Sequence, residues 1–379
     1  MTKKIELIIT GDLCPDERIE KLCLNDEYNK IFNDALQILK EKDFSITNLE
    51  CPLTLEYRPI EKDGPNLIAN PKCAKAIKYA EIDAVTLANN HILDQGQEGL
   101  NKTISICNKL GIKTVGAGAN LKAASMPLYV HIKGISIAII NIAENEFSIA
   151  TKERGGANPL NLVDNYFQIT EAKKNADIVI VIVHGGHEHY SLPSPRMVKT
   201  YRFFADIGAS AVIGHHTHCF SGYEIYKNVP IFYSLGNFVF DRKYSSYSSW
   251  YYGYFIKITF IGDHVENINI FPYEQCNEDI GIHLLAKNRK SKRLQEIDKL
   301  SKIIEDQEML ESKWYEFCDK KRSYYLNVLL RNGKIKSRLI NKRFFRKYYL
   351  NSKKLLPLQN MFSCEAHSEA MLQTIRNEY

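Results

Sequence analysis

Short apolar runs alternate with longer amphipathic stretches from the start of the chain to about Tyr273. This alternation is typical of successive βα units, in which each strand is followed by a helix that covers the sheet. Most of the apolar runs are continuous rather than alternating in polarity, so we expect strands that are buried on both faces. The run at 254–260 alternates better, which favours an antiparallel strand there. The expected strands span residues 5–10, 44–49, 83–88, 135–141, 177–183, 211–214, 231–235 and 254–260.

Amphipathic stretches between these strands predict helices near residues 27–41, 71–80, 97–110, 164–175 and 195–208. Two of these helix starts carry recognisable signals, because Asn70 precedes Pro71 and Asp164 can serve as an N-cap. After residue 285 the chain becomes rich in Lys, Arg and Tyr, and apolar residues recur at helical spacing at Leu294, Ile297, Leu300 and Ile304. The sequence therefore predicts an α/β domain over residues 1–280 and a basic, mainly helical extension over residues 281–379.

Positive charge is concentrated near the C-terminus. The formal net charge is +6, yet residues 286–355 alone carry 21 Lys and Arg against 8 Asp and Glu, so the remainder of the chain is net negative. Such a region is most often a solvated basic helix face, but it also suits a membrane surface or an acidic polymer. Nucleic acid is the least favoured partner, because the sequence contains no nucleic-acid-binding module.

The cysteines and the N-terminus indicate the compartment. Nine cysteines, an odd number, are scattered without any C-x-x-C pair, which argues against a disulfide framework and favours a reducing compartment. The first apolar run, which ends before Gly11, is too short for a signal sequence, and no later run reaches the roughly 18 residues of a membrane span. We expect a cytoplasmic protein that can associate with the inner face of the membrane.

Residues that commonly bind metals follow six of the expected strands. Because the carboxyl ends of strands line one edge of an α/β sheet, we expect these clusters to converge. Taken singly, each cluster could be a turn, a strand cap or a core histidine; their recurrence at one topological position favours a metal site. Imidazole with carboxylate and amide oxygen suits Zn, Mn or Fe, and there are enough ligands for two divalent ions. The clusters are Gly11-Asp12, Asn48-Leu49-Glu50 and residues 89–96, 184–190, 215–218 and 236–241.

The order of these clusters resembles the motif series of the CapA family of poly-γ-glutamate and capsule biosynthesis. The most specific motifs are NNHILDQG at 89–96 and YSLGNFVFD at 233–241, with HGGHEH at 184–189 and GHHTH at 214–218 between them. The resemblance covers roughly residues 5–260. That family is similar in fold to calcineurin-like metallophosphoesterases, which implies a four-layer α/β/β/α sandwich with a two-metal site.

The resemblance also implies roles for individual residues. The metal ligands would be Asp12, Glu50, Asn90, His184, His216 and His218, with His215 as an alternative to His216. His91 would be the catalytic acid that protonates the leaving oxygen, and Asp94 would be its catalytic partner. Residues expected to support the ligands or to contact the substrate are Asn48, Glu188, His215, Glu224 and Asn237.

Four positions depart from the family patterns. A phosphoesterase of this type has His two residues after its first Asp, where this chain has Cys14, and an Asp at the bridging position that Glu50 occupies. The CapA pattern has Trp after the His and Tyr after the Glu of its histidine motif, where this chain has Gly185 and His189. These departures bear on metal binding and turnover rather than on the fold.

Three functions are compatible with these observations. The leading hypothesis is a CapA-type protein of capsule or poly-γ-glutamate biosynthesis, a metal-dependent hydrolase or transferase that acts on an anionic polymer or its precursor beside a membrane-bound capsule synthase. The Asn48-Leu49-Glu50 and YSLGNFVFD motifs favour this hypothesis. The alternatives are a general metallophosphoesterase acting on nucleotides or sugar phosphates, and a non-catalytic factor that binds the polymer or assembles the synthase.

Overall fold

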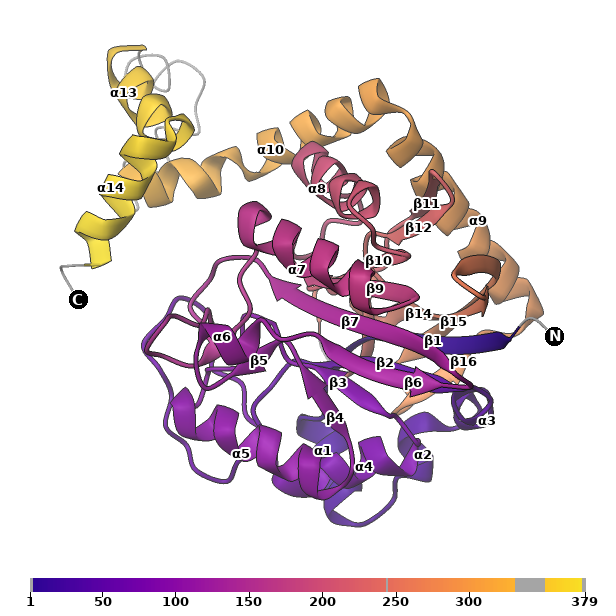
Figure 1. Cartoon of the computed structure of the whole chain (residues 1–379). Coiled ribbons are helices and arrows are strands. Elements are labelled where there is room, and N and C mark those ends of the chain that lie inside the picture. Colours follow the sequence, from indigo (N-terminus) through magenta and orange to yellow (C-terminus); the bar gives the residue numbers. More distant parts are fainter. Residues whose placement is uncertain (1–2, 243–244, 331–351, 377–379) are drawn as a thin grey trace. The chain divides into compact units, whose positions relative to one another are not determined.

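The structure is a computed structural model that describes residues 3–242, 245–330 and 352–376. The chain divides into two units, Met1–Glu311 and Ser312–Tyr379, and all predicted site residues belong to the first. Most of α10 (Gln307–Leu330), together with α13 (Ser352–Ser363) and α14 (Glu365–Arg376), belongs to the second unit (Figure 1). None of the described helices is both long enough and apolar enough to cross a membrane.

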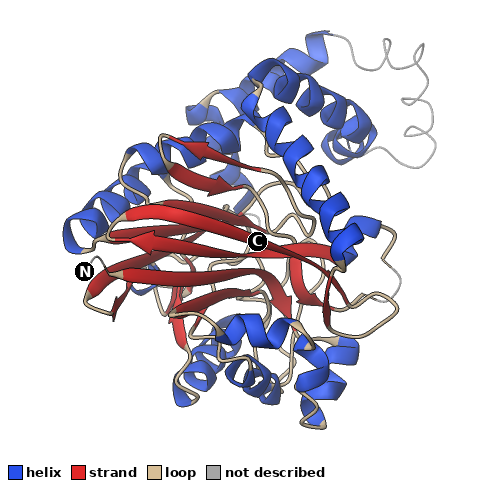
Figure 2. Ribbon diagram, turned by 90° about the vertical axis from the view of Figure 1, so that its right-hand side faces the viewer, coloured by secondary structure: helices blue, strands red, loops and turns tan. Residues whose placement is uncertain are grey.

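Two large sheets form the centre of the first unit (Figures 1 and 2). The eight-stranded sheet has the order β16-β15-β14-β1-β2-β3-β4, and β13 also pairs with β1. Its strands are β1 (Lys4–Cys14), β2 (Phe44–Leu49), β3 (Ala84–Thr86), β4 (Lys113–Val115), β13 (Asn237–Phe240), β14 (Tyr252–Ile261), β15 (His264–Gln275) and β16 (Ile282–Leu284).

The second large sheet has six strands in the order β11-β12-β10-β9-β7-β6. Its strands are β6 (Leu128–Ile132), β7 (Ile135–Ala143), β9 (Ile178–His184), β10 (Ala211–His215), β11 (Tyr223–Tyr226) and β12 (Val229–Phe232). A small two-stranded sheet pairs β5 (Ala117–Gly118) with β8 (Gly156–Ala157).

The central strands of both large sheets run parallel. In one sheet β1, β2, β3 and β4 pair in parallel, and in the other β7, β9, β10 and β12 do so. Every residue of β2 and β9 is buried, which confirms the expectation drawn from their continuous apolar runs. The strand expected to be antiparallel is β14, which pairs antiparallel with both β1 and β15.

Alternate residues of the strands fill different layers of the core. Leu7 and Ile9 of β1 belong to the cluster between the two sheets, which also contains Ile180 of β9, whereas Ile8 belongs to the cluster beneath the helices. The outer face of the eight-stranded sheet is covered by α1 (Glu17–Leu24), α2 (Asn29–Phe32), α3 (Ala35–Lys40), α4 (Ala74–Tyr79) and α5 (Gly96–Lys109).

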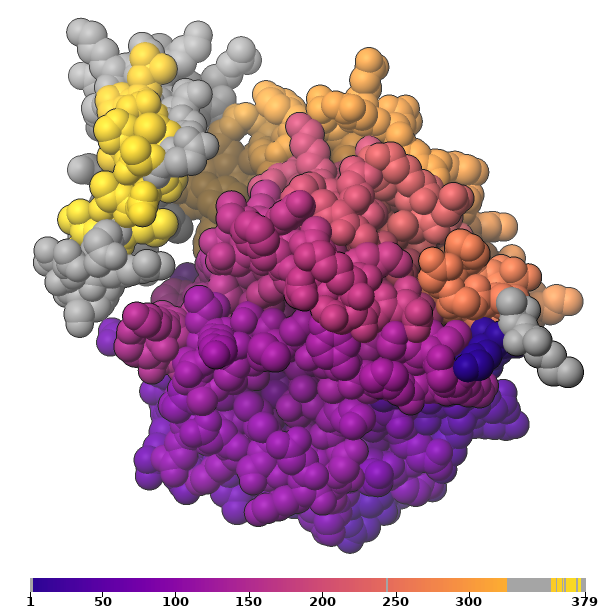
Figure 3. Space-filling view, in the orientation of Figure 1, coloured from indigo at the N-terminus to yellow at the C-terminus, as the bar shows by residue number. Residues whose placement is uncertain are grey.

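The outer face of the six-stranded sheet is covered by α7 (Leu162–Asn175) and α8 (Pro195–Asp206). The predicted α/β/β/α sandwich is therefore confirmed. The space-filling view shows the two sides at the surface, with the purple N-terminal portion on one side of the unit and the magenta portion on the other (Figure 3). A short helix, α6 (Leu121–Ala124), lies between β5 and β6 in sequence.

Of the two predicted helix caps, the structure confirms one and contradicts the other. The Asn70 side chain accepts a hydrogen bond from the Lys72 backbone N–H, as expected for a cap before Pro71. The predicted cap at Asp164 is wrong. Asn161 caps α7 instead, because its side chain accepts hydrogen bonds from the backbone of residues 163 and 164, which places Asp164 inside the first turn.

The helix expected over residues 27–41 is interrupted. Asn33 has a φ of 42°, which no helical residue adopts, and it separates α2 from α3.

At the other end of the first unit, Ile297 and Ile304 of α9 (Lys287–Glu305) are buried, and the Ser301 hydroxyl accepts a hydrogen bond from the Tyr223 N–H of β11. The compact unit thus extends through α9, whereas the domain boundary expected at residue 280 stays a prediction.

Replacement of Ile180 by alanine tests the packing between the sheets. Ile180 is fully buried between the sheets, and truncation should cost about 2–5 kcal/mol of the free energy of unfolding. Ile225→Ala is a matched control, because Ile225 also lies in a strand but is 52% exposed. This substitution should change the free energy of unfolding by no more than about 0.5 kcal/mol. Chemical denaturation measures both, and equal losses would contradict this packing.

Candidate metal centre

The predicted ligands converge where strands of both large sheets end. Asp12 lies near the end of β1, Glu50 directly follows β2, and His184 is the last residue of β9. His216 and His218 follow β10, the neighbour of β9. Residues from distant parts of the sequence therefore meet at one point, as the recurrence of polar clusters after strands predicted.

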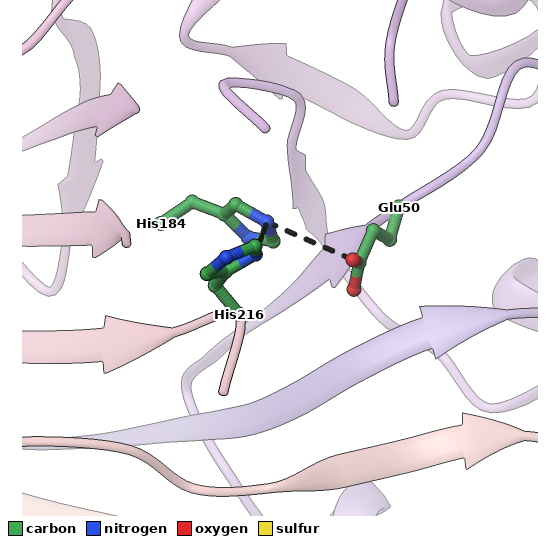
Figure 4. Close-up of side chains that lie close together, drawn as sticks. All are labelled: Glu50, His184 and His216. Carbon is green, nitrogen blue, oxygen red and sulfur yellow. Dashed lines mark hydrogen bonds and ion pairs between the residues drawn. The ribbon is translucent and has the colours of Figure 1, made fainter. Parts of the chain in front are cut away.

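Glu50, His184 and His216 form the first group that could hold an ion, with ligand atoms within 4.8 Å of one another (Figure 4). His184 Nε2 lies 3.7 Å from Glu50 Oε1 and 3.1 Å from His216 Nδ1. Asn90 Oδ1 lies 3.0 Å from the same His184 nitrogen. Two imidazoles, a carboxylate and an amide oxygen thus face a common point.

Asp12, Glu50 and His218 form the second group. His218 Nε2 lies 3.6 Å from Glu50 Oε1, and His218 Nδ1 lies 3.9 Å from Asp12 Oδ2. The Asp12 carboxylate is fixed by the Asn48 side-chain amide, which donates to Oδ1, and by the His216 backbone N–H, which donates to Oδ2. Glu50 is the residue common to both groups.

The Glu50 carboxylate is buried in an unusual state. Neither of its oxygens has a hydrogen-bond partner among the described residues, and the contacts to imidazole nitrogens at 3.6 and 3.7 Å are too long to be hydrogen bonds. Burial first, and then repulsion from Asp12 and Glu188, raises the pKa of Glu50 well above its usual value. A buried carboxylate without a donor is costly, so a cation between the two groups fits this site.

Two histidines of the centre, His184 and His218, are held neutral. Burial first, and then the neighbouring His216, lowers the pKa of both His184 and His218 well below the usual value. Neutral imidazole is the form that binds a metal ion. The donor set therefore fits divalent ions that accept nitrogen and oxygen ligands.

Backbone strain marks the same loop. His216 has a φ of 92° and His218 a φ of 54°, in the left-handed region that residues with a Cβ rarely adopt. Such strain persists only where surrounding contacts hold it, and it concentrates at functional sites. In this loop the strain turns two imidazoles toward the carboxylates of the other sheet.

His215, the predicted alternative ligand, lies outside both groups. Its Nε2 lies 2.9 Å from the Thr10 carbonyl oxygen, and since that oxygen only accepts, the His215 ring donates there. Burial lowers the pKa of His215, so the ring is neutral. His215 therefore supports the end of β1, next to Asp12.

His91, Asp94 and a lysine form a buried network beside the centre. His91 Nδ1 lies 2.6 Å from Asp94 Oδ2, and because a carboxylate only accepts, this nitrogen carries the proton. Lys62 Nζ lies 2.5 Å from Asp94 Oδ1, and the Lys62 side chain is only 3% exposed. No sequence pattern indicated Lys62, which lies in a segment without regular structure between β2 and α4.

The remaining predicted residues divide into near and distant ones. Asn237 Oδ1 lies 2.9 Å from His218 Nδ1, and Asn48 holds Asp12 as described above. The Glu188 side chain is half exposed at the edge of the centre. Glu224, by contrast, accepts hydrogen bonds from Arg202 and Tyr233, and none of its described partners belongs to the two metal-binding groups.

Cys14 does not replace the histidine ligand of the phosphoesterase pattern. Its side chain is fully buried and belongs to the core beneath the helices. Burial first, and then the neighbouring Cys51, raises the pKa of the Cys14 thiol well above its usual value. A neutral, buried thiol is a poor metal ligand, and Cys14 belongs to neither group.

Fold and site define a class: an α/β/β/α sandwich whose strand ends carry two overlapping groups of side chains that could hold metal ions. Within that class, the chain belongs to the family described as bacterial capsule synthesis protein PGA_cap, whose sequence model matches residues 6–242. The resemblance to capsule and poly-γ-glutamate synthesis proteins is thereby confirmed.

Named relatives agree with the family. The chain is 33% identical over 250 residues to the capsule biosynthesis protein CapA of Bacillus anthracis, which covers 63% of this chain and 61% of the relative. It is 32% identical over 237 residues to the PGA biosynthesis protein CapA of Bacillus subtilis (strain 168), covering 61% and 62%. The chain thus spans about three fifths of the length of these curated relatives.

Among solved structures, a 5'-nucleotidase from Candida albicans SC5314 aligns with a TM-score of 0.41 and 10% identity, covering 84% of this chain and 58% of that one. This likeness is too distant to support a functional conclusion.

Replacement of Glu50 by glutamine tests whether this carboxylate holds a cation. Manganese at about 100 times its Kd should stabilise the wild-type chain by about 2.7 kcal/mol, and the variant should lose this gain. In chelator the variant should be at least as stable as the wild type, because Gln resembles the neutral form that burial of Glu50 favours. Thermal unfolding with chelator and with Mn²⁺ measures both effects.

Glu171→Gln is the matched control, since this side chain is 64% exposed on α7 and lies outside the metal-binding groups. It should keep the full stabilisation by Mn²⁺. A Glu50→Gln variant that is stabilised by Mn²⁺ as much as the wild type would contradict the assignment.

Proposed function

We propose that this chain acts in the synthesis of a bacterial capsule or of poly-γ-glutamate, as a metal-dependent hydrolase or transferase on an anionic polymer or its precursor. The observation that carries the proposal is the buried, unpartnered Glu50 carboxylate between two imidazole-containing groups. Membership in the capsule synthesis family supplies the biological context. This chain matches about three fifths of the length of its named relatives, so the proposed activity is that of the matching part alone.

In this proposal two divalent ions share Glu50. His184, His216 and Asn90 would hold one ion, and Asp12 and His218 would hold the other. Manganese, zinc and iron all accept this mixture of imidazole, carboxylate and amide donors. When bound, the ions would polarise a phosphoryl or acyl oxygen of the substrate and make a water molecule more acidic.

His91 acts as the proton donor to the leaving group in this proposal. The Nδ1–H of His91 donates to Asp94, so a doubly protonated His91 ring would give its Nε2 proton to the leaving oxygen and end as the neutral imidazole. Lys62 balances the charge of Asp94, so that the carboxylate remains an acceptor in a buried position. Asn48 and Asn237 keep Asp12 and His218 oriented by hydrogen bonds, as the supporting residues of metal ligands commonly do.

The basic C-terminal region supplies the contact with an anionic partner. The described part of this region includes α9, on which Lys287, Lys292 and Lys299 are exposed. Residues 331–351, including the basic and aromatic segment 341–349, lie outside the described residues. We propose a polymer, a membrane-bound synthase or the inner membrane surface as the partner, and a cytoplasmic location for the chain.

Replacement of His91 by alanine tests the catalytic role. Loss of a general acid should lower turnover by about 10²–10⁴-fold, whereas the metal content should stay unchanged, because His91 belongs to neither metal-binding group. Release of glutamate from a γ-linked oligomer and of phosphate from an aryl ester measures turnover. His131→Ala, at an exposed position of β6, is the matched control and should keep full activity.

Full activity of the His91→Ala variant on the better substrate would contradict its assignment. Tight metal binding with no turnover on either substrate would favour the non-catalytic alternative, a factor that binds the polymer or the synthase. Turnover of the aryl ester alone would favour the general phosphoesterase.

A further inference from the structure

A cavity of about 480 Å³ opens beside the metal centre. It is lined by Glu17, Arg18, His189, Arg242, Tyr247 and Trp250, among other residues. The motifs that identify the family do not account for it, since apart from His189, the last residue of HGGHEH, its lining lies outside them. One of its residues, His189, stands where the family pattern has tyrosine.

Two aromatic side chains connect this cavity to His218. The Trp250 ring lies 4.8 Å from the His218 ring, and the His189 ring lies 6.2 Å from it. Trp250 is anchored, because its Nε1–H donates to the Phe240 carbonyl oxygen and its own carbonyl accepts from the Asn237 side chain. Trp250 is therefore held in a fixed position beside His218, and a group bound next to Trp250 would lie close to the second candidate metal group.

The two arginines of the cavity differ in their availability. Arg18 forms an ion pair with Asp241 through two of its nitrogens and also donates to the Cys276 carbonyl oxygen. Arg242 is exposed, and its guanidinium lies 4.7 Å from the centre of the Trp250 ring. Within the described part of the chain, no carboxylate forms an ion pair with Arg242.

Stacking on Trp250 prepares Arg242 to bind an anion. A guanidinium that lies over an aromatic ring keeps its N–H groups at the edge, where they can donate in pairs to a carboxylate or a phosphate. His189 stacks on Tyr247, with the ring centres 3.8 Å apart, and this pair forms another planar part of the cavity lining. The cavity thus offers a fork of donors together with aromatic surface.

Glu17 limits where an anion can lie. Its side chain is exposed and also lines the cavity, so the lining is not uniformly positive. An anionic group is attracted to the Arg242 edge and repelled at the Glu17 edge. The cavity therefore fits one oxyanion group in one position rather than a diffuse anionic surface.

We infer that this cavity is a substrate subsite that binds one oxyanion group, a carboxylate or a phosphate, through Arg242, while the exposed Tyr247 contacts the adjoining part of the substrate. The inference rests on the proposed function, because the subsite is placed relative to a metal centre that acts on the same molecule. It adds residues that recognise the substrate to those that would hold the metal.

Fluorescence of Trp250 reports binding directly. The chain has two tryptophans, Trp250 and Trp314, so Trp314→Phe leaves Trp250 as the sole emitter. The whole chain of residues 1–379, loaded with metal, is titrated with a γ-linked glutamate oligomer and, separately, with inorganic phosphate. The variants are Arg242→Gln, Glu17→Gln and, as a matched control outside the cavity, Arg154→Gln, whose position is also exposed.

We expect Arg242→Gln to weaken binding of at least one probe by about tenfold or more, because it removes a charged donor pair. Weakening for the oligomer identifies a carboxylate, and weakening for phosphate alone identifies a phosphate. Glu17→Gln should tighten binding of the same probe, and Arg154→Gln should leave it unchanged. Equal affinity of wild type and Arg242→Gln for both probes, or no binding of either probe to the metal-loaded wild type, overturns the inference.

Metal content measured on the same samples distinguishes failure of the proposed function from failure of the subsite alone. A wild-type chain that takes up no metal refutes the proposed function. A chain that holds metal but binds the probes without regard to Arg242 refutes only the subsite.

Discussion

A carboxylate that is buried without a hydrogen-bond donor is among the most costly groups that a folded protein can hold, and Glu50 is such a group. Its surroundings add to the cost, since Asp12 and Glu188 repel its negative charge. Neutral His184 and His218, which lie 3.6–3.7 Å away, do not compensate for it. Divalent cations on the two sides of Glu50 would compensate all of these carboxylates at once.

The four-layer architecture explains how this arrangement is built. Parallel strands of both sheets end near the same point, so that β1 and β2 supply carboxylates and β9 and β10 supply imidazoles. The cluster of apolar side chains between the sheets fixes the distance between these two sources. The strained backbone conformation at His216 and His218 then brings their imidazoles close to the carboxylates of the other sheet.

Much of the fold and of the centre follows from patterns in the sequence. Continuous apolar runs identified the central strands, and polar residues directly after them identified the ligands, because both patterns are local. Lys62, Trp250 and Arg242 carry no such signal, since tertiary packing brings them to the site from a loop, a short 3-10 helix and a strand end. The wrong cap at Asp164 has a local cause, because Asn161 offers the same side-chain chemistry three residues earlier.

The central claim is that the Glu50 carboxylate is held by cations, and anomalous X-ray scattering from crystals of the Mn²⁺-loaded protein tests it most directly. We predict two manganese peaks within ligand distance of Glu50, one beside His184 and His216 and the other beside Asp12 and His218, about 3.5–4 Å apart. The absence of any anomalous peak at Glu50, with this carboxylate bonded only to water or protein, would contradict the account.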